Sequence, residues 1–400
     1  MNNLDKEKKA EEIVQRGIIS QILPDKKDFK NKLVKDKLRF YIGADPTSTA
    51  LHLSHAKNYM LLEEFRQLGH EVIVLIGDFT ARIGDPTDKG SARVQLSKED
   101  VEKNVVDWVK QIKPLLNFDD KDNPAKIMYN SAWLSKLTME DVVELASNTT
   151  VQQMLERDMF EKRMKENKPI FLHEFMYPLM QGYDSVAMDV DVELCGTDQI
   201  FNALMGRTLL KKLKNKDKFV VAVNLMENPV TGELMSKSRG TGIFLNFSAK
   251  EMYGAIMSQS DEMIKVFLIN NTRVPLQEIE EIMKAENPRD AKMRTAFEVV
   301  KVFRGDKEAK EAQDDFIAKF QTKEVPDNLE EINLGKDEAE LFEILKAGLS
   351  NLSNSDIRRL VDQGAIKIDG EEKKDIKEVI DISSGVVVKA GKKNWFKTVG

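Results

Sequence analysis

The chain has 400 residues, of which 41% are hydrophobic and 32% charged, and its formal net charge is −6. This length allows two or three domains, and the composition is typical of a globular protein. A mildly acidic chain is not a general nucleic-acid coat, so any RNA contact is expected to be a local patch. The single cysteine, Cys195, excludes an intramolecular disulfide. The N-terminus lacks the apolar core of a signal peptide, and no apolar run approaches the ~20 residues that cross a bilayer, so we predict a cytoplasmic protein.

Short apolar runs alternate with helical patterns through the first half of the chain. The runs predict strands at residues 39–42, 71–76, 126–129, 189–194 and 219–223. The helical patterns between and after them lie at residues 56–68, 98–115 and 199–213. This alternation predicts an α/β fold with a doubly wound, Rossmann-like parallel sheet. Further helical segments between the third and fourth strands, near 138–147, 149–166 and 172–187, predict an inserted helical subdomain over about 130–187.

The pattern changes after residue 245. A wholly helical stretch follows, and then a segment with Pro326, several acids and few apolar side chains, which predicts a linker. The last part predicts a small α+β domain. The predicted parts are therefore a first domain at 1–245, an all-α domain at 246–322, a linker at 323–337 and a C-terminal domain at 338–400.

The C-terminal part combines turn signals with a basic run. Ser355 is expected to cap a helix that begins at Asp356, and Asp369-Gly370 is expected to turn a hairpin. Residues 388–397 hold four lysines, two aromatic residues and no acid. Lysines contact phosphates and aromatic rings stack on bases, so this run is a candidate RNA contact. The alternative is a solvated terminal strand.

Two of the four histidines, His52 and His55, lie three residues apart where a predicted strand is followed by a helix. The free N–H groups of a helix start attract phosphate, so this pair is a candidate for stabilising a phosphoryl transition state. Two structural histidines are the alternative. The spacing also suits two metal ligands, but no third ligand is evident, so we expect no metal held by protein side chains.

Two other patterns point to a binding site. Lys237 is flanked by small hydroxyl residues in a loop rich in glycine, where it could reach a leaving phosphate; an exposed loop lysine is the alternative. Tyr177, Gln181 and Asp184 stand at i, i+4 and i+7 and so share one helix face. Polar groups flanked by apolar residues need partners when buried, which favours a pocket over an incidental surface.

Together these patterns resemble the class I aminoacyl-tRNA synthetases, whose two signatures, H-I-G-H and K-M-S-K-S, are similar to residues 52–55 and 234–238. Residues 175–184 look like the specificity helix of the bacterial tyrosyl enzymes. The resemblance is specific from about residue 35 to 245, loose through the helical part and moderate in the tail. It implies a ligase that forms tyrosyl-adenylate from L-tyrosine and ATP and transfers the tyrosyl group to tRNA(Tyr). It also implies Mg²⁺ held mainly by ATP phosphates and a homodimer with the inserted helices near its interface.

The resemblance assigns roles to individual residues. The phenolic hydroxyl of tyrosine is expected between Tyr41 and Asp184, and its α-ammonium between Tyr177, Gln181 and Asp85. The residues expected to complete the tyrosine pocket are Asn130 and Gln199. The residues expected to bind ATP are Gly43, Asp45, His52, His55, Gly196, Asp198, Met235, Ser236, Lys237 and Ser238. The groups expected to act on the migrating phosphate and on pyrophosphate are Thr47, His52, His55, Lys89, Arg93 and Lys237.

The tail and one further cluster complete the assignments. Residues 356–371 resemble a small RNA-binding domain shared by a ribosomal protein and bacterial tyrosyl enzymes. The residues expected to contact tRNA are Arg358, Arg359, Lys389, Lys392 and Lys393. A second basic cluster is interpreted as a solvated helix end that complements the helix dipole. Its members are Arg207, Lys211, Lys212, Lys214, Lys216 and Lys218.

The sequence departs from the family pattern at three positions. Ser54 replaces the glycine of the first signature, Leu234 replaces the first lysine of the second, and Ile42 stands where many relatives carry a residue that reaches the ribose. These departures keep other functions open. The alternatives are a small-molecule nucleotidyltransferase, an inactive RNA-binding protein derived from a synthetase, and a tryptophanyl enzyme.

Overall fold

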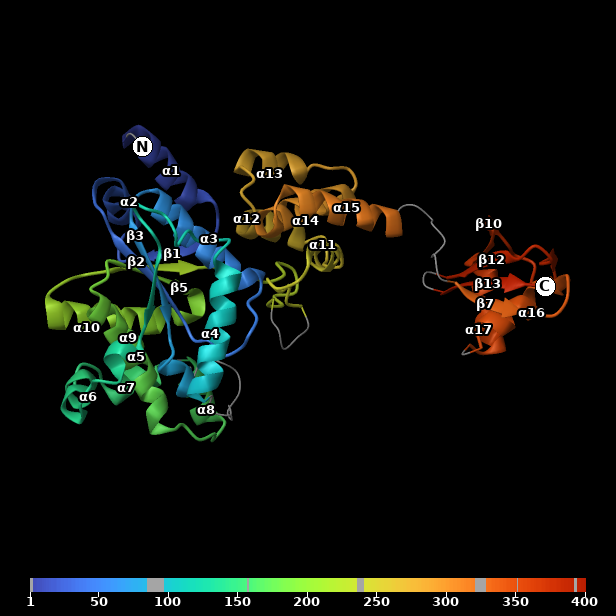
Figure 1. Cartoon of the computed structure of the whole chain (residues 1–400). Helices are drawn as coiled ribbons and strands as arrows, with labels where there is room; N and C mark the ends of the chain where they lie inside the picture. The colour runs from blue at the N-terminus through green and yellow to red at the C-terminus, as the bar shows by residue number, and fades with distance from the viewer. Residues whose placement is uncertain are drawn as a thin grey trace. The chain divides into compact units, whose positions relative to one another are not determined.

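The computed structural model describes residues 3–84, 97–156, 158–235, 241–320, 329–350, 352–391 and 394–400. The chain divides into two compact units, Met1–Asp315 and Phe316–Gly400 (Figure 1). Each unit has its own sheet and core.

The first unit is built around a six-stranded sheet of order β1-β6-β5-β2-β3-β4. Its strands are β1 (Ile19–Leu23), β2 (Arg39–Ala44), β3 (Glu71–Ile76), β4 (Lys126–Tyr129), β5 (Val192–Gly196) and β6 (Phe219–Val223). Strands β2 to β6 run parallel, as predicted. The edge strand β1 was not predicted and pairs antiparallel with β6. Ser20 and Gln21 in β1 are exposed, so this strand has no continuous apolar run in the sequence.

Helices cover both faces of this sheet. They are α1 (Asn3–Gln15), α2 (Lys26–Lys35), α3 (Leu53–Gln67), α4 (Lys98–Ile112), α9 (Met176–Met188) and α10 (Ile200–Lys214). Helix α3 packs on β2 and β3, whereas α10 packs on β5 and β6. Figure 1 shows α3 and α4 on one side of the strands and α9 and α10 on the other. The connections thus run in opposite directions from β2 and β5, and this reversal creates a crevice at the carboxyl ends of these two strands.

The insertion between β4 and β5 is helical, as expected. It consists of α5 (Ser131–Leu134), α6 (Met139–Ala146), α7 (Val151–Leu155), α8 (Asp158–Lys165), a short 3₁₀ helix (Leu172–Phe175) and α9. Helix α9 packs closely on α10 at two glycines. A Cβ on Gly182 would lie 2.8 Å from Leu209 Cδ1 and 3.2 Å from the backbone nitrogen of Gly206. This approach fixes the position of α9 over the end of the sheet.

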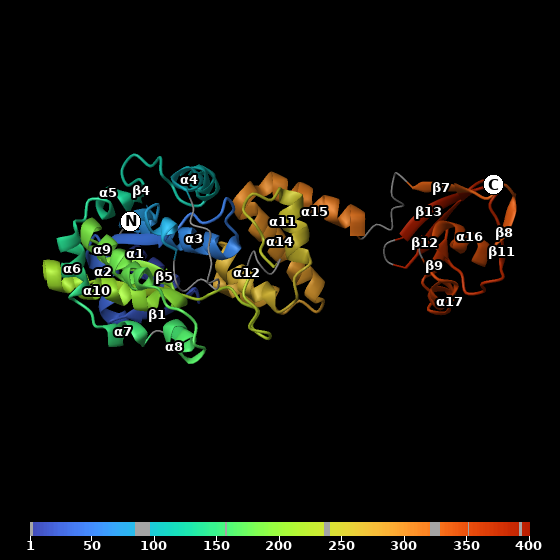
Figure 2. The same ribbon diagram turned by 90° about the horizontal axis from the view of Figure 1, so that it is seen from below.

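The described residues from 249 to 320 form helices only. They are α11 (Ala249–Met257), α12 (Met263–Asn271), α13 (Leu276–Ile282), α14 (Pro288–Arg304) and α15 (Asp306–Phe320). Helix α14 packs on α11 and α12, and α12 also contacts α3 of the α/β part (Figure 2).

The second unit is a small α+β fold. Its sheets have the orders β10-β9-β12-β13-β7 and β11-β8. The elements are β7 (Glu330–Asn333), β8 (Glu338–Glu340), α16 (Leu341–Gly348), α17 (Asn354–Asp362), β9 (Ile366–Ile368), β10 (Glu371–Glu372), β11 (Val379–Asp381), β12 (Val386–Ala390) and β13 (Asn394–Val399). The hairpin predicted at Asp369-Gly370 joins β9 to β10, with both turn residues at positive φ. The predicted cap was wrong by two residues, because the Ser353 side chain accepts the Asp356 N–H.

His70, which precedes β3, provides a test of how burial affects stability. The side chain is 1% exposed, and its Nδ1 accepts the backbone N–H of Leu38 at 3.2 Å. Burial lowers the pKa of His70 to about 4. The folded chain therefore keeps His70 neutral while the unfolded chain takes up a proton below about pH 6.5. This contribution to stability is complete above pH 6.5 and is lost as the pH falls towards 4.

We expect His70→Asn to reduce the loss of stability of the first unit between pH 6.5 and pH 5 by on the order of 1–2 kcal/mol. Urea unfolding at the two pH values measures this difference. His173 is exposed and serves as the matched control, so His173→Asn should keep the wild-type pH dependence. An equal pH dependence in the His70 variant and the wild type would contradict the assignment.

Candidate active site

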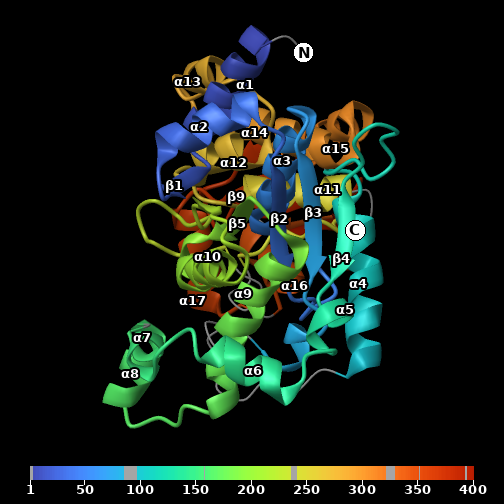
Figure 3. The ribbon, with the colours of Figure 1, turned by 90° about the vertical axis from the view of Figure 1, so that its left-hand side faces the viewer.

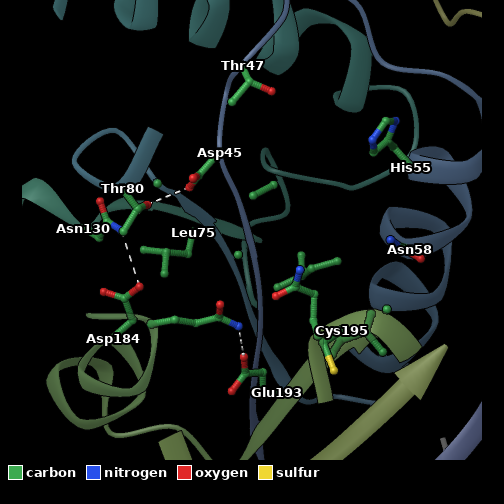
Figure 4. A pocket seen from close by; sticks show the side chains of 18 of the residues that line it. Asp45, Thr47, His55, Asn58, Leu75, Thr80, Asn130, Asp184, Glu193 and Cys195 are labelled. Atoms are coloured by element: carbon green, nitrogen blue, oxygen red, sulfur yellow. Dashed lines mark hydrogen bonds between the residues drawn. The ribbon is translucent and has the colours of Figure 1, made fainter. Parts of the chain in front are cut away.

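A pocket opens at the crevice where the sheet order reverses (Figure 4). Its walls come from the carboxyl ends of β2 and β5, from the segments after β3 and β4, and from one face each of α3 and α9. Most of the described residues that the sequence predicts for tyrosine and ATP line it. They are Gly43, Asp45, Thr47, His55, Asn130, Tyr177, Gln181, Asp184, Gly196, Asp198 and Gln199.

Other predicted residues lie elsewhere. Tyr41 is 1% exposed and lies outside the pocket lining, with its hydroxyl 2.9 Å from Ser185 Oγ. His52 lies beside His55, outside the lining. Met235 is buried, and its N–H donates to the Met226 carbonyl at 2.9 Å. The predicted site residues that fall outside the described part of the chain are Asp85, Lys89, Arg93, Ser236, Lys237, Ser238, Lys392 and Lys393.

Asp184 places a buried carboxyl at one end of the pocket, where it is 3% exposed. Trp133 Nε1 donates to its Oδ1 at 2.7 Å, and Asn130 Nδ2 donates to its Oδ2 at 3.4 Å. Burial raises the pKa of Asp184, and these two N–H groups oppose the rise. Asn130 is itself held, because its Oδ1 accepts the Phe79 N–H at 3.0 Å. Trp133 was not predicted as a site residue. The one feature of the sequence that could have indicated it is an indole N–H three residues, about one helical turn, after Asn130.

Asp45 connects β2 to α9 across the pocket. Tyr177 Oη donates to Asp45 Oδ2 at 2.9 Å, and Thr80 Oγ1 donates to Asp45 Oδ1 at 2.6 Å. Gly77 permits this approach, because a Cβ there would lie 1.9 Å from Asp45 Oδ1. The phenol predicted to contact the α-ammonium of tyrosine is therefore oriented by a carboxylate.

The two histidines are neutral at pH 7. Burial lowers the pKa of His52 to about 4, and burial together with His52 and Lys57 lowers the pKa of His55 to about 3. The Nδ1 atom of His55 accepts the backbone N–H of His52 at 3.2 Å. Because Nδ1 is an acceptor in the neutral ring, the proton of His55 is on Nε2. His55 is thus suited to donate one hydrogen bond and not to supply a positive charge.

Several pocket residues were not predicted. Asn58 lies on α3 three residues after His55, and its buried Oδ1 has no partner among the described residues. Glu193 on β5 also lines the pocket and pairs with Lys218. The interpretation of Lys218 as a solvated residue was wrong, since it is 1% exposed. Helical spacing from His55 could have identified Asn58, whereas nothing in the local sequence signals the Glu193–Lys218 pair.

The described residues contain no group of three or more His, Cys, Asp or Glu side chains that could hold a metal ion. Over the same part of the chain, no helix is long and apolar enough to cross a membrane.

Comparison with known proteins agrees with the fold. Residues 33–321 match the family of class I tRNA synthetases (W and Y). The chain belongs to this family. It is 41% identical to a tyrosine–tRNA ligase of Moorella thermoacetica over an alignment of 394 residues. This alignment covers 96% of this chain and 94% of the relative. It is 40% identical to a tyrosine–tRNA ligase of Thermotoga maritima over an alignment of 371 residues. That alignment covers 92% of this chain and 91% of the relative.

Solved structures show the same fold. A C-terminally truncated mitochondrial tyrosyl-tRNA synthetase of Aspergillus nidulans superposes with a TM-score of 0.67 at 23% identity, covering 80% of this chain and 99% of that chain. A tyrosyl-tRNA synthetase of Archaeoglobus fulgidus, solved with L-tyrosine, gives a TM-score of 0.60 at 20% identity and covers 78% of this chain and 100% of that chain.

Proposed function

We propose that this chain attaches L-tyrosine to tRNA(Tyr). The observation that carries the proposal is the buried Asp184 carboxyl, held by Trp133 and Asn130 at one end of a pocket that Tyr177 and Gln181 also line. A carboxylate in this position accepts the phenolic hydroxyl of tyrosine, which phenylalanine and tryptophan do not offer. The near full-length similarity to tyrosine–tRNA ligases supports the same substrate. The pocket on α9 has no evident use in a small-molecule nucleotidyltransferase.

The proposed reaction is the one that membership of the family implies, and it has two steps. In the first step, the tyrosine carboxylate attacks the α-phosphorus of ATP, a P–O bond to the acid forms, and pyrophosphate leaves. In the second step, a hydroxyl of the terminal ribose of tRNA attacks the carbonyl carbon, and AMP leaves. Protein groups form no covalent bond in either step, so positioning and electrostatic stabilisation carry the catalysis. Asp198, just beyond β5, suits the ATP ribose because a carboxylate accepts from two vicinal hydroxyls.

The groups proposed around the phosphates are His55, Thr47 and three cations of the chain. His55 near the start of α3 and Thr47 in the segment between β2 and α3 both line the pocket, and both donate to the migrating phosphate. Lys237, Lys89 and Arg93 neutralise pyrophosphate. Mg²⁺ arrives with ATP and is held by the phosphates and water.

The test is tyrosine-dependent exchange of pyrophosphate into ATP, with phenylalanine and tryptophan as comparison substrates. Exchange with tyrosine alone supports the proposal. Exchange with tryptophan instead would assign a tryptophanyl enzyme. An absence of exchange with retained tRNA binding would assign an inactive RNA-binding relative, and neither exchange nor tRNA binding would favour the nucleotidyltransferase.

We predict that Lys237→Ala lowers kcat of adenylation by about 100-fold or more and leaves the Kd for tyrosine within about twofold. The reason is that a cation on the leaving group acts mainly in the transition state. Single-turnover adenylation measures kcat, and equilibrium dialysis with tyrosine measures the Kd. The matched control is Lys211→Ala, an exposed lysine on α10. An unchanged kcat in the Lys237 variant would remove this role.

The second unit is proposed to bind tRNA. Lys389 on β12 lies opposite Trp395 on β13, with its Nζ 4.7 Å from the indole centroid. Arg358 on α17 lies over the Phe342 ring at 5.5 Å, and Arg359 is exposed and pairs with Asp356. Basic groups beside aromatic rings are able to contact phosphates and stacked bases. Translation consumes charged tRNA, so a cytoplasmic location belongs to the same proposal.

The inserted helices are proposed to form a homodimer interface. Figure 3 shows α6, α7 and α8 at one end of the first unit, beyond the ends of the strands. Exposed large apolar side chains concentrate on this insertion and next to it, at Tyr129, Met139, Val143, Val151, Met164, Phe171 and Leu172. Such a concentration is typical of a protein interface.

We predict that the double variant Met139→Glu/Val143→Glu shifts the chain from dimer to monomer. Both residues lie on α6 and are exposed, so the folded first unit should persist. Light scattering after gel filtration measures the mass. The control is Val230→Glu, an exposed valine outside the insertion. A wild-type monomer would contradict the dimer.

A further inference from the structure

A buried ion pair lies directly behind the proposed tyrosine site. Lys218, just before β6, donates its Nζ to Glu193 Oε2 on β5, and the two residues are 1% and 2% exposed. The same Nζ donates to Ser185 Oγ on α9 at 2.7 Å. Burying two charges is costly unless they are paired and hydrogen-bonded. A hydrophobic pair of similar size would fill this space at a lower desolvation cost, so the pair is not explained by stability alone.

The ion pair is connected to Gln181, which lines the pocket, and to Tyr41, which the sequence predicts as a contact of the phenolic hydroxyl but which lies just outside the pocket lining. Gln181 Nε2 donates to Glu193 Oε1 at 3.0 Å, and both residues line the pocket, where Figure 4 labels Glu193. On the other side, Ser185 Oγ is 2.9 Å from the Tyr41 hydroxyl. Tyr41 and Glu193 are also direct neighbours in the parallel ladder of β2 and β5, so their side chains leave the same face of the sheet.

The backbone leaves room for this cluster. A Cβ on Gly206 of α10 would lie 2.6 Å from Lys218 Nζ and 2.7 Å from Ser185 Oγ. Glycine at this position therefore lets the ammonium group reach both partners between α9, α10 and the sheet. Three elements of the fold thus meet at one buried ammonium group.

We infer that the Glu193–Lys218 pair is a positioning device for tyrosine recognition, which orients the Tyr41 hydroxyl through Ser185 and the Gln181 amide through Glu193. The inference rests on the proposed function, in which Gln181 lines the tyrosine pocket, and on the role that the sequence analysis predicts for Tyr41. Neither member of the pair is a catalytic residue. Glu193 lines the pocket through its bond to Gln181, and Lys218 acts entirely through its neighbours. Their effect is on the affinity for tyrosine and on its discrimination from phenylalanine.

The test uses Ser185→Ala in the full chain. This variant removes one hydroxyl and leaves the Glu193–Lys218 bond in place. It removes the oxygen that Lys218 and the Tyr41 hydroxyl share, together with the longer contact of Ser185 with Glu193. We expect the KM for tyrosine in pyrophosphate exchange to rise about tenfold, which corresponds to about 1.4 kcal/mol. The preference for tyrosine over phenylalanine should fall by a similar factor, while the KM for ATP stays within about twofold.

A second variant tests the charge of the pair itself. Glu193→Gln retains an oxygen that accepts the Gln181 amide but removes the negative partner of Lys218. We expect the same rise in the KM for tyrosine, with kcat per active site reduced much less. Active-site titration corrects both variants for any misfolded fraction.

The control is Thr295→Ala in α14, a fully buried hydroxyl that donates to the Ala291 carbonyl at 2.7 Å. It should lower thermal stability without changing the KM for tyrosine. If Ser185→Ala and Glu193→Gln behave like this control, the pair is only structural and the inference is wrong.

Calorimetric binding of L-tyrosine separates this result from a failure of the proposed function. If the wild type binds tyrosine without exchange and both variants weaken binding about tenfold, the enzymatic proposal fails and the positioning inference stands. If the wild type exchanges and the variants bind tyrosine normally, only the inference fails. A wild type that binds no tyrosine overturns both.

Discussion

Replacing Asp184 by asparagine is expected to lower kcat/KM for tyrosine by about 100-fold or more. The carboxyl presents one oxygen to Trp133 Nε1 and the other to Asn130 Nδ2. An amide has only one oxygen, so its NH₂ group would oppose one of these donors and leave it unsatisfied, which costs about 1–3 kcal/mol. The phenolic hydroxyl of the substrate also loses a charged acceptor, worth about 1.5–3 kcal/mol. The first loss is present in the free enzyme too and acts by displacing the side chain, whereas the second acts on the complex. The upper end of the second range corresponds to about 100-fold and sets the expected factor.

Pyrophosphate exchange with tyrosine and with phenylalanine measures both parts of this prediction. A site that hydrogen-bonds a substrate hydroxyl rejects the analogue that lacks it, and tyrosyl-tRNA synthetases are the established example of this effect. The Asp184 variant should therefore lose its preference for tyrosine while its KM for ATP is retained. Asp217→Asn is the control, because Asp217 is a half-exposed partner of Arg207 on the surface. A variant that keeps the tyrosine preference would place the phenolic hydroxyl elsewhere.

Replacing His55 by alanine is expected to lower kcat of adenylation by about 100- to 1,000-fold and to change the KM for tyrosine little. His55 lines the pocket with its Nε2 protonated, because Nδ1 accepts the His52 N–H. Loss of one preorganised donor to a developing charge has this size in other enzymes. His55→Asn, which keeps an N–H donor near the same place, should recover part of the rate.

The pH dependence separates a neutral donor from a cation. Because the pKa values of His52 and His55 are lowered to about 4 and about 3, neither ring gains a proton between pH 8 and pH 5.5. The adenylation rate of the wild type should show no step near pH 6.5. A step that disappears in the His55 variant would show that the imidazolium is the active form. The exposed His173 provides the control, and its alanine variant should match the wild type at every pH.

Much of the site could be predicted because its chemistry is arranged locally along the chain. Tyr177, Gln181 and Asp184 lie within two turns of α9, and their spacing alone puts them on one face. Asp45, His55, Asn130 and Asp198 each follow directly after a strand or begin a helix, where a doubly wound sheet collects its ligands. Site residues at such positions can be predicted from the sequence once the strands and helices are assigned correctly.

The features of the fold and of the site that the sequence did not predict depend on contacts between segments far apart in the chain. Lys218 is a lysine at the end of a basic run, and only the meeting of α9, α10 and β5 reveals that it is buried beside Glu193. Strand β1 has two exposed polar residues and is stabilised by its antiparallel pairing with β6, some 200 residues along the chain. The cap of α17 is Ser353 and not the predicted Ser355. Both serines suit the position by residue type, and only the structure shows that the Ser353 side chain accepts the Asp356 N–H.

The sequence by itself determined the family, five of the six strands of the first sheet and the polar face of α9 that lines the pocket, because these features depend on residue type and short spacing. The tertiary structure decided the state and surroundings of those residues. Burial makes His52 and His55 neutral, Trp133 and Asn130 hold the Asp184 carboxyl, and a charge pair connects Tyr41 to Gln181. Desolvation and side-chain contacts depend on segments brought together by folding, so they cannot be obtained from the local sequence.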